Sequence, residues 1–595
     1  MNMLNNATAA QLERSVANNH RELFALNAGT TPLRNPGVHK SILLAAFFVF
    51  ILALNCAAQN LPDSLVKKID ALYEKWNEPG SPGCAVGVVR NDSLIFAKGY
   101  GMANLEYDNI PNTPETLFHM ASVSKQFTAY SIILLAKQGK INLDDDIRKY
   151  LPSFPDLGVK ITVRQLLNHT SGIRDQWQLL AIAGTRLDDV ITQEQVIKIL
   201  NKQQGLNFKP GEKFSYSNSG FTLLAEIVRS VTGKTLREFT DSAIFKPLAM
   251  KATHFHNDYT EIEKNRAYSY YRKDSAGFSN SILSYSNEGA TSLFSNVEDL
   301  SKWIMNFYNP KAGDAQDISQ LVVKGKLNNG KEIKYALGIV SDNYKNWTQY
   351  QHGGSDAGYR TFISVFPDLK MGFIVLGNLG EINTQDKANQ MADLFIHDKN
   401  PAVTNITEKK TAGKVPAEDL PFLKKQLGDY INAEGNTLSL VLKNDSLFYR
   451  PGTDDLLLIK DTAGVYSMFY APVIKFKFST GSTDAFTVIT PDNDLHFTRY
   501  QKKEITDDKV LQQYTGIYHS PELDCNYGIV LKDHKLYLTN SKYSDQELSF
   551  AGTDHLLDNF WWMSHLHITR NGKDQITGFE VNSGRIMHLR FDKIH

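Results

Sequence analysis

Three short motifs contain the side chains suited to nucleophilic chemistry, and the first is Ser122-Val-Ser-Lys125. It lies near the start of a segment, Phe118 to Lys140, whose apolar spacing predicts a buried helix. Residues three apart on a helix are neighbours, so the Lys125 amine can reach the Ser122 oxygen and activate it as a nucleophile. The amide groups and dipole at a helix start also favour an anion near this serine. The motif predicts attack by Ser122 on an ester or amide carbonyl.

The Ser-x-x-Lys spacing is weak evidence by itself. Ser64 and Lys67 have the same spacing with no catalytic residue type around them, and a helix cap beside a surface lysine explains that pair. Ser122 differs because its helix is apolar enough to be buried and because two further motifs follow it in the chain.

The second motif is Tyr216-Ser-Asn218. In an extended segment residues two apart face the same way, so both side chains would face one cleft. A phenol, with an ordinary pKa near about 10, becomes a base at neutral pH only if cations stabilise its phenolate, and Lys125 and His352 are the candidates. Asn218 would bind a substrate amide. A lone Tyr-x-Asn would be no more than a turn.

The third motif is His352-Gly353-Gly354-Ser355, directly ahead of a predicted strand. Its two glycines permit close approach of another backbone. The amides of Ser355 and Ser122 would form an oxyanion hole, in which one donor is typically worth about 3 to 4 kcal/mol of transition-state stabilisation.

In this order the three motifs resemble the family of class C β-lactamases, serine D,D-peptidases, D-aminopeptidases and related esterases. Leu166-Leu-Asn-His-Thr-Ser-Gly172 and Gly289-Ala-Thr-Ser-Leu-Phe-Ser295 are similar to framework stretches of that family, and the resemblance extends from about Leu61 to Asp398. It implies an α+β fold, an antiparallel sheet flanked by helices with a helical lobe. The roles that it implies are nucleophile for Ser122, general acid and base for Lys125 and Tyr216, substrate amide ligand for Asn218 and electrostatic partner for His352.

Gly353 departs from the family pattern. Many β-lactamases and carboxypeptidases of the family have a threonine here, whose hydroxyl helps bind the substrate carboxylate. Our hypothesis is that recognition of a terminal carboxylate is weakened, which favours D-aminopeptidase, esterase or amidase activity over efficient β-lactamase activity. The alternative is a non-hydrolytic penicillin-binding or sensor protein that uses the same cleft; the intact acid/base pair argues against it.

Hydrophobic periodicity places the elements that must position these motifs. Leu61 to Trp76 has helical spacing, and Cys84 to Val89 followed by Leu94 to Lys98 predicts a β-hairpin. A mostly helical middle follows, and strands return at Gly358 to Phe366 and Gly372 to Leu376. We therefore expect a sheet built from strands at both ends of this region.

Beyond the hydrolase region the sequence is strand-like and repeats once. Leu427-Gly-Asp-Tyr430 resembles Tyr514-Thr-Gly-Ile-Tyr518. Short strands separated by turns predict two small antiparallel, lipocalin-like β-barrels, because closure removes exposed edges. The expected organisation is an N-terminal extension and signal peptide at 1–58, a β-lactamase-like serine hydrolase domain at 61–398, a polar linker at 399–420, and barrels at 421–505 and 506–595.

The N-terminal segment predicts export. Ile42 to Leu54 is uninterrupted apolar sequence before Cys56-Ala-Ala58. As a helix it would span about 20 Å, short of the hydrocarbon core of about 30 Å, which favours a signal peptide cleaved after Ala58 over a retained anchor. We expect a periplasmic or extracellular bacterial protein, with membrane contact only through this segment. Lipidation of Cys56 is disfavoured because Leu54 and Asn55 lie where small residues are required.

Composition limits the partners. Lys plus Arg and Asp plus Glu number 64 each, so no net field would attract nucleic acid, and we expect none as a partner. The expected partner is a small-molecule or peptide substrate, with the cell wall as one source of such a substrate. After signal cleavage Cys84 and Cys525 alone remain, too few for a disulfide framework.

Two other features are given structural interpretations. His254-Phe-His256 has alternating imidazoles, but no Cys, Asp or Glu cluster completes a site in the sequence, so no metal and no cofactor are predicted. Phe560-Trp-Trp562 is expected to be barrel core rather than a platform for sugar rings.

Overall fold

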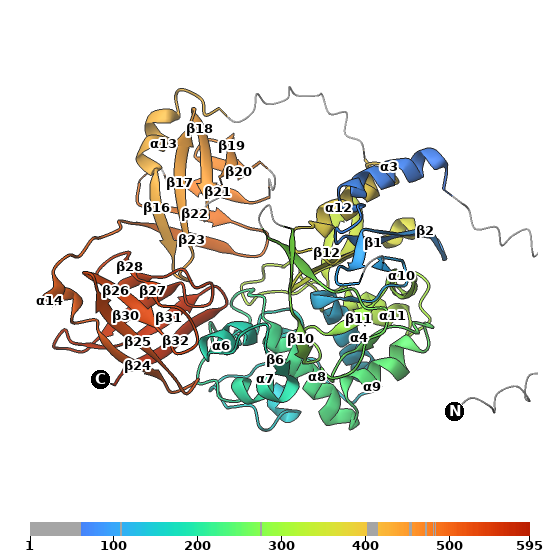
Figure 1. Ribbon diagram of the computed structural model, residues 1–595, viewed down its shortest axis with the longest axis horizontal. Helices are drawn as coiled ribbons and strands as arrows, with labels where there is room; N and C mark the ends of the chain where they lie inside the picture. The colour runs from blue at the N-terminus through green and yellow to red at the C-terminus, as the bar shows by residue number, and fades with distance from the viewer. Residues whose placement is uncertain are drawn as a thin grey trace, which may run out of the picture. The chain divides into compact units, whose positions relative to one another are not determined.

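The computed structural model of the protein describes residues 61–107, 110–273, 277–400, 414–451, 455–469, 473–479, 481 and 483–594 (Figure 1). The predicted signal segment and most of the predicted linker lie outside the described residues. Among the described residues, no helix has the length and apolar character needed to cross a membrane.

A six-stranded antiparallel sheet forms the centre of the hydrolase region, and it joins strands from both ends of that region, as predicted. The first strand pairs with the last, with Cys84 opposite Gly377. In spatial order the strands are β12 (Val340–Tyr344), β13 (Trp347–Asp356), β14 (Tyr359–Phe366), β15 (Met371–Gly377), β1 (Cys84–Arg90) and β2 (Ser93–Tyr100).

Helices cover both faces of this sheet. On one face, α3 (Asp63–Tyr73) and α12 (Thr384–Asp393) share an apolar cluster with β1. On the other face, α10 (Val297–Asn306) approaches so closely that a Cβ on Gly87 would lie 2.5 Å from the side chain of its first residue. Because both faces are covered, β1 is buried along its length and ends at the exposed Arg90.

The helical lobe is built around α4 (Ser124–Lys137), which is buried on nearly all sides and is therefore a core helix. Threonine capping boxes begin three other helices of the lobe. The other helices of the lobe are α5 (Val163–Leu167), α6 (Gln176–Ile182), α7 (Gln193–Leu200), α8 (Asn218–Thr232), α9 (Leu236–Thr240) and α11 (Ala315–Leu321).

Several short strands border the lobe. A three-stranded sheet consists of β5 (Phe118–His119), β11 (Leu293–Ser295) and β7 (His254–Phe255), and β5 lies directly before the first motif in the chain. The remaining pairs are β3 (Met102–Asn104) with β4 (Ile110–Pro111), β6 (Val190–Thr192) with β10 (Ser284–Ser286), and β8 (Tyr270–Arg272) with β9 (Phe278–Asn280).

Two antiparallel β modules follow, orange and red in Figure 1, as the repeat predicts. After α13 (Leu420–Gln426), the first is a closed barrel of β16 (Gly428–Asn432), β17 (Thr437–Lys443), β18 (Ser446–Arg450), β19 (Leu456–Thr462), β20 (Val465–Met468), β21 (Lys475–Phe478), β22 (Ala485–Ile489) and β23 (Asp494–Tyr500). After α14 (Asp508–Leu511), the second has nine strands: β24 (Gly516–Ser520), β25 (Cys525–Lys532), β26 (Lys535–Thr539), β27 (Gln546–Glu547), β28 (Ser549–Phe550), β29 (His555–Leu557), β30 (His565–Arg570), β31 (Ile576–Ser583) and β32 (Ile586–Lys593).

The two modules share a detail that explains the repeated sequence. Tyr430 and Tyr518 are fully buried, and each hydroxyl donates to the carbonyl four residues earlier, at 2.7 Å and 2.6 Å respectively. Each tyrosine thus ties the first strand of its module to the backbone that precedes it. Phe560 and Trp562 pack against the apolar core of the second module, as predicted, whereas Trp561 is exposed.

A buried ion pair joins the second module to the start of α6. Arg174 donates from Nη1 to both carboxylate oxygens of Glu522, at 3.0 and 2.8 Å, and both side chains are more than nine-tenths buried. Arg174 also donates to the carbonyls of Met587 and His588. Burial raises the pKa of Glu522 and lowers that of Arg174. The loss of hydration therefore destabilises each charged form by more than the attraction between the two charges stabilises it.

Candidate active site

Ser122 lies in a single 3₁₀ turn, Ala121–Val123, immediately before α4. Ala121 has φ 48°, in the left-handed region that residues with a Cβ seldom adopt. The helix predicted from Phe118 to Lys140 is therefore wrong at its start, where a short strand and this turn replace it. The consequence is a serine presented just ahead of the helix that carries Lys125.

Lys125 is fully buried, and its Nζ lies 3.0 Å from Ser122 Oγ. The same nitrogen donates to Asn218 Oδ1 at 2.9 Å and to the Ala290 carbonyl at 2.7 Å. Burial lowers the pKa of Lys125 to about 7, although Asp356 and Asp175 oppose this shift. At neutral pH a large fraction of Lys125 is therefore a neutral amine.

Asn218 begins α8 and connects Lys125 to Asp175. Its Nδ2 donates to Asp175 Oδ2 at 2.9 Å, so the amide is oriented with Oδ1 toward Lys125. Asp175 also accepts the backbone N–H of Asn218 and caps α6. Asn218 thus orients the lysine, and its expected role as a substrate ligand stays a prediction.

The structure corrects the charge state that we expected for Tyr216. Its ring centroid lies 5.0 Å from Lys125 Nζ and 4.9 Å from the Arg585 guanidinium. Burial nevertheless raises the pKa of Tyr216 well above its ordinary value, and a hydrogen bond with Ser122 and the charge of Arg585 offset only part of this. Tyr216 is therefore a neutral phenol rather than a resting phenolate, and it can donate a proton.

His352 is not the predicted cation. Its Nδ1 lies 2.7 Å from the Gly353 carbonyl, which can only accept, and its Nε2 lies 2.8 Å from the Tyr335 hydroxyl. The ring therefore carries its proton on Nδ1. Burial, together with the charge of Lys125, lowers the pKa of His352 to about 3. Neutral His352 positions Tyr335, which lies against the Tyr216 ring.

The His-Gly-Gly-Ser segment of β13 offers a free strand edge beside Ser122. β12 pairs with β13 only as far as Gln351, so among the described strands residues 352–356 pair on one side alone, with β14. A Cβ on Gly354 would lie 2.3 Å from the Met120 carbonyl, so a glycine is required where β13 meets the serine turn. Gly353 has no such neighbour, its nearest being a Phe362 carbon at 3.6 Å.

The structure brings the eight predicted site residues together around one cleft of about 630 Å³. Seven of them line it, and Lys125 lies beneath, hydrogen-bonded to Ser122. The seven are Ser122, Tyr216, Asn218, His352, Gly353, Gly354 and Ser355. The pairing of the Ser122 and Ser355 amides as an oxyanion hole stays a prediction.

Arg585 is a cleft residue that the sequence motifs missed, and it comes from the hairpin between β31 and β32 of the second module. Its backbone N–H donates to Gln178 Oε1 at 2.7 Å, and its carbonyl accepts from Asn207 Nδ2 at 2.8 Å. The side chain is about half exposed, and its nearest carboxylate oxygen, on Asp175, is 3.8 Å away. The catalytic region thus holds the backbone of Arg585 while the guanidinium faces the cleft.

Asp356 is a second missed residue, at the end of β13. It accepts a hydrogen bond from the Thr291 hydroxyl, and burial raises its pKa to about 6. Glu381 also lines the cleft and is paired with Arg272. The cleft therefore presents carboxylates as well as the Arg585 cation.

Comparison with known proteins agrees with the motifs. Penicillin-binding protein 4* of Bacillus subtilis is 26% identical over 395 residues, which cover 64% of this chain and 86% of the relative. A D-aminopeptidase of Gluconobacter oxydans is 27% identical over 48% of this chain, and the match spans about half (53%) of its own length.

One solved structure shows the same fold. The octameric penicillin-binding protein homologue from Pyrococcus abyssi matches with a TM-score of 0.50 and 23% identity, over 73% of this chain and 98% of that one. The Beta-lactamase family model matches residues 63–397, which is more than half of the chain. This protein belongs to the β-lactamase family.

Proposed function

We propose that the protein is a serine hydrolase that cleaves a small amide or ester through an acyl-enzyme on Ser122. The observation that carries the proposal is the environment of the Lys125 nitrogen. Asn218 Oδ1 and the Ala290 carbonyl can only accept hydrogen bonds, so they take the two N–H groups of a neutral amine. The lone pair is then left facing Ser122 Oγ, 3.0 Å away, where a general base must lie.

The reaction follows from these positions. Lys125 accepts the Ser122 proton as Oγ bonds to the substrate carbonyl carbon, and the carbonyl oxygen becomes an oxyanion beside the serine turn and β13. The Tyr216 phenol donates its proton to the leaving nitrogen or oxygen as that bond breaks, and the Lys125 ammonium returns a proton to Tyr216. Water then attacks the acyl-enzyme, and the same groups restore Ser122.

The substrate class that we favour is a short peptide or amide with a free ammonium group, as for a D-aminopeptidase. Asp356 and Glu381 supply carboxylates for such a group, and Gly353 supplies no hydroxyl for a substrate carboxylate. The D-aminopeptidase relative supports this choice.

The second candidate, a penicillin-binding protein or sensor, is supported by the Bacillus subtilis relative. We also propose export, supported by the apolar segment before Ala58.

Intact-mass spectrometry of the full chain after incubation with a fluorophosphonate, and separately with a penicillin, tests the acyl-enzyme. We expect a fluorophosphonate adduct on the wild type and none on Ser122→Ala. A persistent penicillin adduct would indicate the penicillin-binding candidate, and a transient one a β-lactamase. Folded wild-type protein that gains no adduct from either reagent would refute the hydrolase proposal.

The effect of Gly353 is tested by the variant Gly353→Thr. The space around Gly353 admits a Cβ without a contact below 3.6 Å, so we expect the variant to fold. The new hydroxyl should raise kcat/KM for substrates with a terminal carboxylate by about tenfold, since a hydrogen bond to a charged group contributes about 1.5 to 3 kcal/mol. Steady-state kinetics on paired substrates with and without the carboxylate measures this; an unchanged ratio in the folded variant would end the hypothesis.

The contribution of the second module to the cleft is tested by Arg585→Ala. Loss of the half-exposed cation should lower kcat/KM by about tenfold for substrates with an anionic group near the cleft mouth and by less for neutral ones. Arg590→Ala is the matched control, because Arg590 is on the same hairpin but exposed and paired with Asp592. Equal effects of the two variants would show that Arg585 does not bind substrate.

A further inference from the structure

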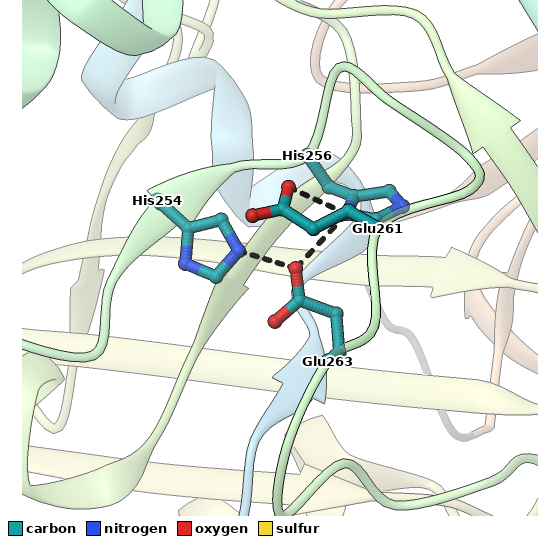
Figure 2. Close-up of side chains that lie close together, drawn as sticks. All are labelled: His254, His256, Glu261 and Glu263. Atoms are coloured by element: carbon teal, nitrogen blue, oxygen red, sulfur yellow. Dashed lines mark hydrogen bonds and ion pairs between the residues drawn. The ribbon is translucent and has the colours of Figure 1, made fainter.

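A second cluster of chemically active side chains lies outside the cleft, where His254 and His256 face Glu261 and Glu263 (Figure 2). His254 is on β7, and the chain after His256 turns back to bring the two carboxylates to the imidazoles. One nitrogen from each histidine and one oxygen from each glutamate all lie within 4.8 Å of one another. This corrects the expectation that no carboxylate completes the histidine pair.

The closest contacts converge on one carboxylate oxygen. Glu263 Oε1 lies 2.6 Å from His254 Nε2 and 3.0 Å from His256 Nδ1. Glu261 Oε2 lies 3.8 Å from His256 Nδ1. The side chains of His256 and Glu263 are 5% and 7% exposed, so solvent does little to separate these groups.

The hydrogen bonds of His254 indicate that the cluster holds a cation. Its Nδ1 lies 3.2 Å from the Ala252 carbonyl, which can only accept, so Nδ1 carries a proton. In a neutral imidazole Nε2 then has a lone pair, and this lone pair faces the Glu263 carboxylate at 2.6 Å. Two acceptors at that distance require a proton or a metal ion between them, because their lone pairs would otherwise repel each other.

The donor set favours a metal ion. Two imidazole nitrogens and two carboxylate oxygens are typical zinc ligands, and bonds of about 2.0 to 2.1 Å place tetrahedral ligand atoms about 3.3 Å apart. The contacts of 2.6, 3.0 and 3.8 Å lie on both sides of that separation. A histidine whose second nitrogen donates to a backbone carbonyl also has the outer contact usual for a metal ligand. We propose that His254, His256, Glu261 and Glu263 bind one Zn²⁺ ion.

Arg237 supports the fourth ligand. Its Nη2 donates to Glu261 Oε1 at 2.8 Å, and Nη1 pairs with Glu261 Oε2. This contact holds Glu261 beside the cluster and contributes a positive charge outside it. Two carboxylates and two neutral imidazoles balance the charge of a divalent ion.

The ion has a structural role, because four protein ligands leave no open position for a substrate. β7 pairs with β11 through His254 opposite Phe294, and the His256 N–H donates to the Ser292 carbonyl at 2.8 Å. The segment before β11 includes Ala290, whose carbonyl accepts from Lys125. Zinc therefore holds residues 254–263 in the conformation that pairs with β11, next to the segment that supports the lysine, and its loss lowers thermal stability.

The experiment is zinc binding to the full chain after chelator treatment and dialysis. Competition with a chromogenic chelator and elemental analysis should give one Zn²⁺ per chain, with a rise in Tm on binding. His256→Gln and Glu263→Gln should weaken binding by about tenfold or more, as even outer-shell substitutions cost about 10- to 100-fold. The matched control is His534→Gln, which removes an exposed histidine paired with Asp508 in the second module and should bind as the wild type does.

Co²⁺ added to the wild type provides a readout that does not depend on the variants folding. We expect the intense visible absorption of tetrahedral cobalt, displaced by Zn²⁺. Absence of that absorption and of Zn²⁺ binding in folded wild-type protein would overturn the proposal, as would full binding by folded His256→Gln. Fluorophosphonate labelling of Ser122 is a separate measurement, so this result and the proposed hydrolase activity succeed or fail independently.

Discussion

Replacing Lys125 with methionine is expected to abolish acylation of Ser122 at neutral pH. Methionine fills a similar volume but has no base, and loss of a general base costs about 10²- to 10⁴-fold in rate. The substitution also leaves Asn218 Oδ1 and the Ala290 carbonyl without their donor, at a cost of about 1 to 3 kcal/mol in stability. The measurement is the rate of fluorophosphonate labelling, with circular dichroism as the test of folding.

The control for this variant is Lys137→Met, at the other end of α4. Lys137 is about half exposed and pairs with Asp314 and Asp317, so its loss should leave the labelling rate unchanged. In the proposed mechanism the neutral amine is the active form, and burial lowers the pKa of Lys125 to about 7. The labelling rate should therefore fall about tenfold per pH unit below that value, as protonation removes the base. A rate that is flat between pH 5 and about 8 would contradict the role of Lys125 as base.

The largest expected effect on stability comes from Glu522→Ala. This substitution leaves Arg174 buried without its counter-charge, and removal of one partner from a buried pair costs about 3 to 5 kcal/mol. We expect a lower Tm for the transition that includes the second module, together with lower activity because Arg585 loses its support. Differential scanning calorimetry measures the shift.

Two further variants show whether the burial of this pair is the cause. Asp188→Ala breaks the exposed Arg186–Asp188 pair nearby and should change stability by less than about 1 kcal/mol. The double variant Arg174→Met, Glu522→Leu removes both charges and should regain part of the loss, since an unpaired buried charge no longer remains. If Glu522→Ala were as stable as Asp188→Ala, the buried pair would not join the second module to α6.

The three motifs could be found in the sequence because their spacing reflects local geometry. The Ser122–Lys125 contact spans one helical turn, and the repeat around Tyr430 and Tyr518 predicted the two β modules. The turn at Ala121 was missed because the left-handed conformation there depends on the approach of β13, far along the chain.

The motifs could not predict the charge states of the site residues or the contacts between segments far apart in the chain. The phenolate predicted for Tyr216 required cationic neighbours, with Lys125 and His352 as the candidates. Burial keeps the His352 imidazole neutral and raises the pKa of the phenol, and burial depends on the whole fold. Asp175 orients Asn218 from another helix, and Arg585 is brought to the cleft from the second module. Such contacts between distant segments have no periodicity or spacing that identifies them.

If Arg585 binds substrate, catalysis and substrate selection depend on different parts of this chain. In the proposed mechanism the three motifs determine how a carbonyl is attacked, and they lie within the region of the family match. The cation at the cleft belongs to a hairpin outside that region. We expect mutation or exchange of that hairpin to change which substrates are selected while the three motifs stay intact, so relatives that share every motif could diverge in substrate through a part of the chain outside the motifs.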